Sequence, residues 1–126
     1  MIVLDTDVLI EIFDRMSSRG EEALRKVLES GEDIAITSIN LHEILYGLQK
    51  YAKPVTQVLL LPVLDYTKKD AELSAEIESK AETLGKPIRR TDAMIAAISL
   101  NRGAALYTFD LKHFSSLKTL GLALFS

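Results

Sequence analysis

The chain has 126 residues, 48% of them hydrophobic and 26% charged, which is typical of one globular domain with a sizeable core. It has no cysteine, which excludes disulfides and thiolate zinc sites, and its two histidines argue against a histidine-rich metal site. The net charge of −3 argues against a protein that coats nucleic acid non-specifically, but it is compatible with a site that grips a few phosphates.

The chain shows no sign of a membrane segment. Its longest dense apolar run, residues 58–64, is too short to span a bilayer and is interrupted by Pro62. The first residues have neither the basic region nor the cleavage-site pattern of a signal peptide. Together with the lack of cysteine, these features suit a cytoplasmic protein that does not associate with a membrane.

Short apolar strands and amphipathic helices are expected to alternate along the chain. The expected strands lie at residues 2–5, 33–37, 60–66, 104–108 and 122–125, with Pro62 at the edge or start of the third. The expected helices lie at residues 7–14, from Ser18 to a stop at Ser30-Gly31, from Ser38 to about Tyr51, at 67–84, and at 92–102. Because the strands are apolar without alternation, the sequence predicts an α/β fold whose mainly parallel sheet is covered on both faces.

Capping signals mark several helix starts. Ser18 with Glu21 forms a capping box, Ser38 is expected to cap the next helix, and Thr67 with Asp70 opens the long one. Four residues of the long helix are expected to face inward: Leu73, Ile77, Ala81 and Leu84. Its acidic run is interpreted as a solvated face supported by a Glu76–Lys80 pair: Asp70, Glu72, Glu76, Glu78 and Glu82.

Four acids that are far apart in the sequence are expected at one edge of this sheet. Asp5 ends the first strand, and Asp110 follows the fourth. Glu43 lies one turn into the helix after the second strand, and Asp92 lies in the first turn of the helix at 92–102. Open parallel sheets bind ligands beyond the carboxyl ends of their strands, so this convergence is the main functional signal.

Each acid taken alone has an ordinary structural explanation. Asp5, Asp7 or Asp92 would serve as a helix cap or as a partner of the helix dipole. Asp110 would be a turn residue. Taken together, however, several carboxylates in one cleft repel each other unless a divalent cation holds them. A set of oxygen ligands without His or Cys selects Mg²⁺ or Mn²⁺, which engage phosphate oxygens and activate water.

The helix at 38–51 carries two apolar stripes. One consists of Leu41, Ile44, Leu45 and Leu48. Ile39 and Tyr46 form the other, and Glu43 lies within it, either as a sheltered carboxylate or as a solvated residue on a dimer face. A chain this small does not bury both stripes easily, so the pattern predicts a homodimer.

Four blocks in order, "LDTDVLIEI", "SINLHEILYG", "TDAMIAAISL" and "LYTFDLKHF", resemble the PIN-domain ribonucleases, most closely the small toxins of VapBC toxin–antitoxin systems. The resemblance covers nearly the whole chain as one PIN-like nuclease domain, 1–126. It implies a three-layer α/β/α fold with a parallel sheet of about five strands. It also implies Mg²⁺- or Mn²⁺-dependent cleavage of RNA, a cognate antitoxin as partner, and a homodimer.

The resemblance also implies roles for particular residues. The acidic quartet of the family, which holds the metal and is catalytic, falls on Asp5, Glu43, Asp92 and Asp110. Thr6 and Thr108 match supporting hydroxyl residues of the family. Asp7 departs from the family pattern of Ser or Asn, so it is either an extra ligand or a helix cap.

Basic residues next to two of these acids are candidates for holding RNA phosphates. Arg89 and Arg90 precede Asp92, whereas Lys112 and His113 follow Asp110. The alternative is that these side chains are only solvated.

Two other functions compete with the ribonuclease. In a haloacid-dehalogenase-like phosphatase, Asp5 would be the nucleophile and Asp7 the acid/base. That chemistry requires a glycine-bearing loop after the acids and a further acidic pair, which the chain lacks. The other alternative is a catalytically silent PIN-like binding module whose acids are only caps.

Overall fold

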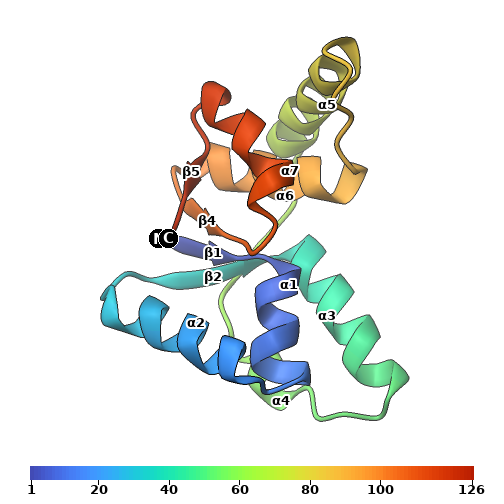
Figure 1. Cartoon of the computed structure of the whole chain (residues 1–126). Helices are drawn as coiled ribbons and strands as arrows, with labels where there is room; N and C mark the ends of the chain where they lie inside the picture. Colours follow the sequence, from blue (N-terminus) through green and yellow to red (C-terminus); the bar gives the residue numbers. More distant parts are fainter.

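A parallel five-stranded sheet lies between two layers of helices in the computed structural model, which describes all residues, 1–126 (Figure 1). The strands are β1 (Ile2–Leu4), β2 (Ile34–Thr37), β3 (Val63–Leu64), β4 (Ala105–Tyr107) and β5 (Ala123–Leu124). Their order across the sheet is β3-β2-β1-β4-β5, and every neighbouring pair is parallel. The α/β fold with its parallel sheet is therefore confirmed.

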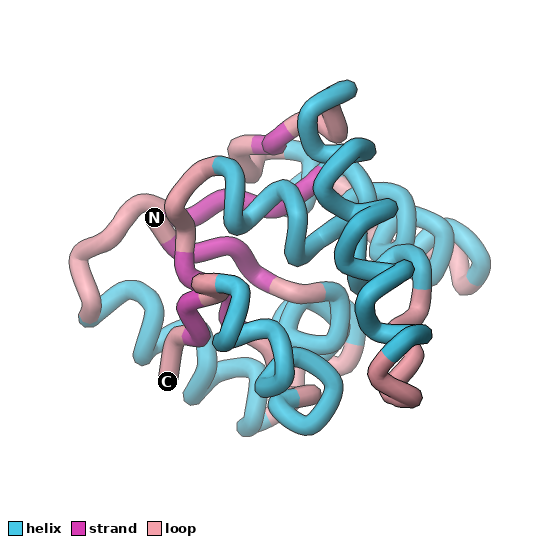
Figure 2. The backbone as a smooth tube through the Cα atoms, turned by 90° about the horizontal axis from the view of Figure 1, so that it is seen from above, coloured by secondary structure: helices cyan, strands magenta, loops and turns pink.

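Helices from the two halves of the chain cover opposite faces of the sheet (Figures 1 and 2). The first face is covered by α1 (Thr6–Leu9), η1 (Ile10–Asp14), α2 (Ser18–Glu29), α3 (Ser38–Lys50) and α4 (Thr56–Leu59). The second face is covered by α5 (Lys68–Thr83), α6 (Arg90–Asn101), α7 (Leu111–Phe114) and η2 (Ser115–Leu120).

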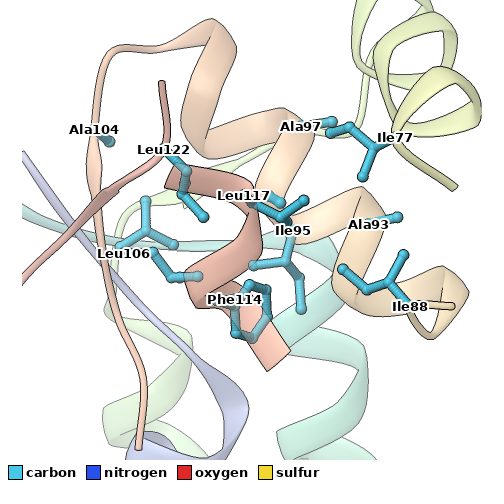
Figure 3. Packing of buried hydrophobic residues seen from close by; sticks show 12 residues of the cluster. Ile77, Ile88, Ala93, Ile95, Ala97, Ala104, Leu106, Phe114, Leu117 and Leu122 are labelled. Carbon is cyan, nitrogen blue, oxygen red and sulfur yellow. The ribbon is translucent and has the colours of Figure 1, made fainter. Parts of the chain in front are cut away.

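The central strand β1 contributes to the hydrophobic cores on both faces. Ile2 and Leu4 pack with α1, α2 and α3, whereas Val3 packs with α5 and α6 on the other side. Figure 3 shows the second core, in which Leu106 of β4 lies close to Phe114 of α7. All of these side chains are buried, which explains why the strand sequence lacks apolar–polar alternation.

The direction in which the strands are added reverses between β1 and β4. From β1 the chain adds β2 and β3 on one side, and then returns to add β4 and β5 on the other. The chain therefore has a topological switch point where the carboxyl ends of β1 and β4 lie side by side. The backbone N–H of Asp5 donates to the carbonyl of Tyr107 over 2.9 Å, which fixes this junction.

Two of the predicted caps lie one residue too late in the sequence. The cap of α2 is Ser17, whose Oγ accepts from the N–H of Gly20 at 3.0 Å. The cap of α3 is Thr37, which forms a capping box with Asn40. In both pairs of adjacent hydroxyl residues, the first keeps an extended backbone and the second is already helical, so the first one caps. The predicted start of the long helix at Thr67 and Asp70 is confirmed, and the two residues form a capping box.

Other boundaries also differ from the prediction. The expected strand at 60–66 is reduced to β3, which Pro62 immediately precedes at the edge of the sheet. Leu60, the first residue of the expected strand, is instead the C-cap of the short helix α4. The first helix begins at Thr6 and changes after Leu9 into the π-helix η1.

The long helix α5 buries one acid that was predicted to be solvated. Asp70 is 0% exposed, and its carboxylate accepts from Asn101 and from Arg102 at the end of α6. No ion pair joins Glu76 to Lys80. Of the four residues expected to face inward, Leu73, Ile77 and Ala81 do so, but Leu84 follows the last turn and is 75% exposed.

None of the helices has the length and apolar character required to cross a membrane.

Candidate active site

Asp5 occupies the switch point and is almost fully buried. Its Oδ1 accepts from the backbone N–H of Thr6 at 2.9 Å and from Asn40 Nδ2 at 3.4 Å. Its Oδ2 accepts from Thr108 Oγ1 at 2.7 Å. Asp5 does cap α1, as the ordinary explanation requires. However, it is also held by Thr108, which directly follows β4, and by Asn40 of α3, and a cap does not need these contacts.

The surroundings of Asp5 disfavour its charge. Burial, followed by the neighbouring charge of Asp7, raises the pKa of Asp5 to about 7, and Asp92 acts in the same direction. Hydrogen bonds from Thr108 and from the N–H of Thr6 oppose this rise. A cation close to these acids would favour the ionised carboxylate, so the site is electrostatically suited to one.

Asp7 is not a helix cap, because Asp5 caps α1 and Asp7 lies in the first turn of that helix. Asp7 Oδ2 accepts from the backbone N–H of Phe109 at 3.1 Å, which ties α1 to the loop after β4. Its Oδ1 is buried and has no hydrogen-bond partner. Burial raises the pKa of Asp7, and Asp110 adds to this effect. An unpaired buried oxygen beside other carboxylates is suited to a hard cation, as is a donor set made entirely of oxygen.

Glu43 is connected to Asp5 through Thr6 and Asn40. Thr6 Oγ1 donates to Glu43 Oε1 at 2.7 Å, and Asn40 Nδ2 donates to Thr6 Oγ1 at 3.0 Å. Asn40 is fully buried, and its side-chain amide donates both to Asp5 and to Thr6, the residue that holds Glu43. Sequence reasoning missed Asn40, although its position three residues after Thr37 marks the N3 position of a capping box.

Asp92 and Asp110 share one basic neighbour. Arg89 Nε donates to Asp92 Oδ2 at 2.9 Å, and Arg89 Nη2 lies 3.9 Å from Asp110 Oδ2. Asp92 is buried in the first turn of α6. Asp110 is about one-third exposed, and its Oδ2 lies 2.6 Å from His113 Nδ1. Both acids thus lie beyond the carboxyl ends of the strands, and each has a partner within the chain.

The predicted acids gather at one edge but do not form a ready-made metal site. Hydroxyl, guanidinium and imidazole donors hold Asp5, Glu43, Asp92 and Asp110 separately. No group of three or more His, Cys, Asp or Glu side chains is positioned to hold an ion as it stands. Metal binding by this set would therefore require some of these side chains to turn towards a common centre.

The basic candidates differ in their surroundings. Arg89 forms an ion pair with Asp92, whereas Arg90 pairs with Glu78 on α5 at 3.2 Å. Lys112 and His113 are exposed on α7 and line a pocket of about 580 Å³. A second pocket, of about 370 Å³, is lined by Asp7, Ile10, Glu11, Arg15, Arg19, Phe109 and Asp110. Asp110 and His113, which contact each other, therefore have a pocket on each side.

The raised pKa of Asp5 predicts how the protein responds to pH in EDTA. Between pH 3.8, the usual aspartate pKa, and about pH 7, the folded state retains a proton that the unfolded state releases. The free energy of unfolding should therefore fall as the pH rises through this window, by up to a few kcal/mol. The raised pKa of Asp7 acts in the same direction. Urea denaturation at pH 5 and pH 8 measures the difference, and equal stability at the two pH values would contradict the assignment.

Comparison with known proteins identifies relatives over nearly the whole chain. The PIN domain family matches residues 2–119. The tRNA(fMet)-specific endonuclease VapC of Shigella flexneri is 26% identical over 119 residues, covering 89% of this chain and 88% of that protein. Ribonuclease VapC2 of Rickettsia felis is 26% identical over 125 residues, covering 94% and 92%.

A solved structure agrees with the fold. The crystal structure of VapBC2 from Rickettsia felis, bound to a DNA fragment from its promoter, contains a chain that is 26% identical to this one. The two chains superpose with a TM-score of 0.82, over 99% of this chain and 98% of the other. Sequence and fold thus agree on the same relatives.

Proposed function

This chain belongs to the PIN-domain family, as a ribonuclease toxin of the VapC type, and we propose that it cleaves RNA with Mg²⁺ or Mn²⁺ at the acidic edge around Asp5. Nucleases of this family are typically metal-dependent. We also propose that residues 1–126 form one nuclease domain and that the protein acts in the cytoplasm. Family membership argues against the phosphatase alternative, in which Asp5 would be a nucleophile.

The residues that would hold the cation are Asp5, Glu43, Asp92 and Asp110. The observation that carries this proposal is the burial of Asp5 beside Asp7 and Asp92, which raises its pKa to about 7. A carboxylate kept in such surroundings costs stability, and a divalent cation would remove that cost. A bound cation would neutralise the charge of the phosphate and activate a water molecule for attack on phosphorus.

The other polar residues of the site orient the acids and the substrate. Thr108 and Asn40 fix the two carboxylate oxygens of Asp5, while Thr6 positions Glu43. Arg89 neutralises Asp92 and is itself largely exposed, so its guanidinium is free to exchange a carboxylate for an RNA phosphate. Arg89 would thereby bring the RNA strand to the acids that hold the cation.

We expect the purified protein, freed of any inhibitor, to cut RNA in Mg²⁺ or Mn²⁺ and to stop when EDTA is added. One relative is named for its action on tRNA(fMet), so this tRNA belongs among the substrates tested, beside unstructured RNA. Gel analysis of end-labelled RNA, with the metal restored after EDTA, measures the effect. Undiminished cleavage in EDTA would refute the metal mechanism, and no cleavage under any condition would favour the silent binding module.

We also propose a cognate antitoxin as the inhibitor of this chain. The related VapBC2 structure from Rickettsia felis, named for both components, supports this partner. A small protein encoded beside this one, with a DNA-binding N-terminal part and an amphipathic tail, is the expected antitoxin. Its addition should stop RNA cleavage at a one-to-one ratio, whereas cleavage that persists in its excess would contradict the pairing.

A homodimer through α3 remains a prediction. Tyr46 is 64% exposed on this helix, although Ile39, Leu41 and Leu45 pack against the two cores. The exposed apolar surface of α3 is therefore smaller than the sequence suggested. Light scattering at about 20 µM, a concentration chosen because assembly depends on mass action, should give twice the monomer mass. We expect Tyr46→Glu to shift the protein to a monomer, and a monomeric wild type at this concentration would refute the dimer.

A further inference from the structure

We propose that the pocket on the His113 side of the acids binds the phosphate that neighbours the scissile one in the RNA strand. This inference rests on the proposed ribonuclease function and adds a separate substrate contact to it. The pocket has a volume of about 580 Å³ and is lined by Lys86, Pro87, Lys112, His113, Ser115 and Ser116.

The pocket lies next to the acidic edge of the sheet. His113 lines it and also lies 2.6 Å from Asp110 through Nδ1. On its other wall, Lys86 and Pro87 belong to the loop that leads to Arg89, which contacts Asp92. An RNA strand with one phosphate at the acids would therefore bring the next phosphate to this pocket.

Charge distinguishes this pocket from the one on the other side of Asp110. That second pocket has three carboxylates, Asp7, Glu11 and Asp110, against the two guanidinium groups of Arg15 and Arg19. Arg15 already pairs with Glu11, so the charge of that pocket is negative on balance and disfavours a phosphate. The pocket of Lys86 and Lys112 includes no carboxylate.

Two features of the pocket lining favour the backbone of the strand over its bases. Neither Lys86 nor Lys112 takes part in an ion pair, in contrast to Arg89 and Arg90, so both ammonium groups are free to meet a phosphate. The lining contains no Phe, Tyr or Trp on which a base would stack, and the one aromatic ring present, the imidazole of His113, is held at Asp110. Ammonium and hydroxyl groups bind phosphate oxygens without reading sequence.

Both walls of the pocket are anchored in the same hydrophobic core. Ile88 follows Pro87, and Phe114 follows His113, and both are buried in the cluster that Figure 3 shows. The backbone of Lys86 is fixed as well, because its N–H donates to the carbonyl of Ala81 at 2.9 Å. The walls are therefore held apart by packing, and the basic side chains project from a preformed frame.

The test compares two charge-matched double variants. Lys86→Gln/Lys112→Gln removes both free charges of the pocket. Lys68→Gln/Lys69→Gln removes two exposed charges at the opposite end of α5 and serves as the control. The substrate is a short RNA that the wild type cuts at one site, made in a second version with a neutral methylphosphonate in place of the phosphate next to that site.

The pocket variant should raise KM about tenfold at unchanged kcat, and it should flatten the salt dependence of kcat/KM by about 0.7 in log–log slope, as one lost phosphate contact predicts. The methylphosphonate should raise the KM of the wild type by a similar factor but leave the pocket variant unaffected. The control variant should behave as the wild type, with equal melting temperatures for all three proteins.

Two results would overturn the inference while leaving the ribonuclease intact. One is RNA kinetics of the pocket variant that equal those of the control. The other is unchanged RNA kinetics with weaker antitoxin binding, which would assign the pocket to an acidic protein segment. A wild type that cuts no RNA would instead overturn the proposed function, and the phosphate site with it.

Discussion

Asp5→Asn should abolish RNA cleavage and, at the same time, make the metal-free protein more stable at pH 8. The loss of activity should be at least about a hundredfold, since even residues that only support metal ligands have effects of 10–100-fold. The gain in stability follows from the raised pKa of Asp5, because an ionised carboxylate is costly where it is buried beside Asp7 and Asp92. One pKa unit corresponds to about 1.4 kcal/mol, so we expect a gain of at least about 1 kcal/mol.

The substitution preserves the local structure. The Asn oxygen still accepts from the N–H of Thr6, as the N-cap of α1 requires, and the Asn amide can donate to Thr108 Oγ1. The variant should therefore also lose most of the fall in stability between pH 5 and pH 8. Asp33→Asn is the matched control, since Asp33 is exposed at the amino end of β2, away from the acidic edge.

Thermal melts in EDTA and in excess Mg²⁺ separate the metal ligand from the helix cap. A bound ion stabilises only the state that binds it, so the rise in melting temperature on adding Mg²⁺ should shrink in Asp5→Asn and persist in Asp33→Asn. If Asp5 is only a cap, Asp5→Ala costs about 1 kcal/mol and leaves cleavage and the metal-induced rise intact. That outcome would remove Asp5 from the proposed site.

The sheet was predictable from the sequence because the chain alternates apolar strands with amphipathic helices. The central strand β1 is buried on both faces, which its uniform apolar sequence indicated, whereas the edge strands β3 and β5 are partly exposed. Boundaries were less predictable where two capping residues are adjacent, as at Thr37 and Ser38. The short β3 was overestimated because the apolar run around it is divided between α4 and a two-residue edge strand.

The acidic edge was predictable for a topological reason. In a parallel sheet, residues that follow different strands meet at one edge whatever their separation in the sequence. The contacts around these acids were not predictable, since they depend on how α1, α3 and the loop after β4 pack together. Asn40 and Lys86 carried no individual signal, because an asparagine in a first turn and a lysine in a loop are ordinary at such positions.

Asp70 is the clearest case of tertiary structure overriding the sequence pattern. Its place in an acidic run suggested a solvated face, yet it is fully buried where α5 begins beside the end of α6. Burial raises its pKa, but hydrogen bonds from Asn101, Thr67 and Arg102 outweigh burial and lower the pKa to about 2. The ionised carboxylate therefore holds α5 to α6, the two helices of the second layer.

We expect Asp70→Ala to destabilise the protein by about 3 kcal/mol, the lower end for breaking a buried ion pair, because Arg102 is partly exposed and can regain water. Asp70→Asn should cost less, since it retains an acceptor for the capping box with Thr67. Glu72→Ala, an exposed change on the same helix, should alter stability by less than about 0.5 kcal/mol. Urea denaturation at pH 7 orders the three variants.

The pH dependence and the activity give independent checks on the Asp70 assignment. Because its pKa is lowered from 3.8 to about 2, Asp70 stabilises the fold above pH 4, and this contribution is lost as the pH falls towards 2. The difference between wild type and Asp70→Ala should therefore narrow in acid. RNA cleavage by the folded variant should equal that of the wild type, since Asp70 contacts the last turn of α6 and Asp92 lies in the first. Equal stabilities of Asp70→Ala and Glu72→Ala at pH 7 would show that the buried pair contributes nothing, and the junction of α5 and α6 would then depend on apolar packing around Ile77 alone.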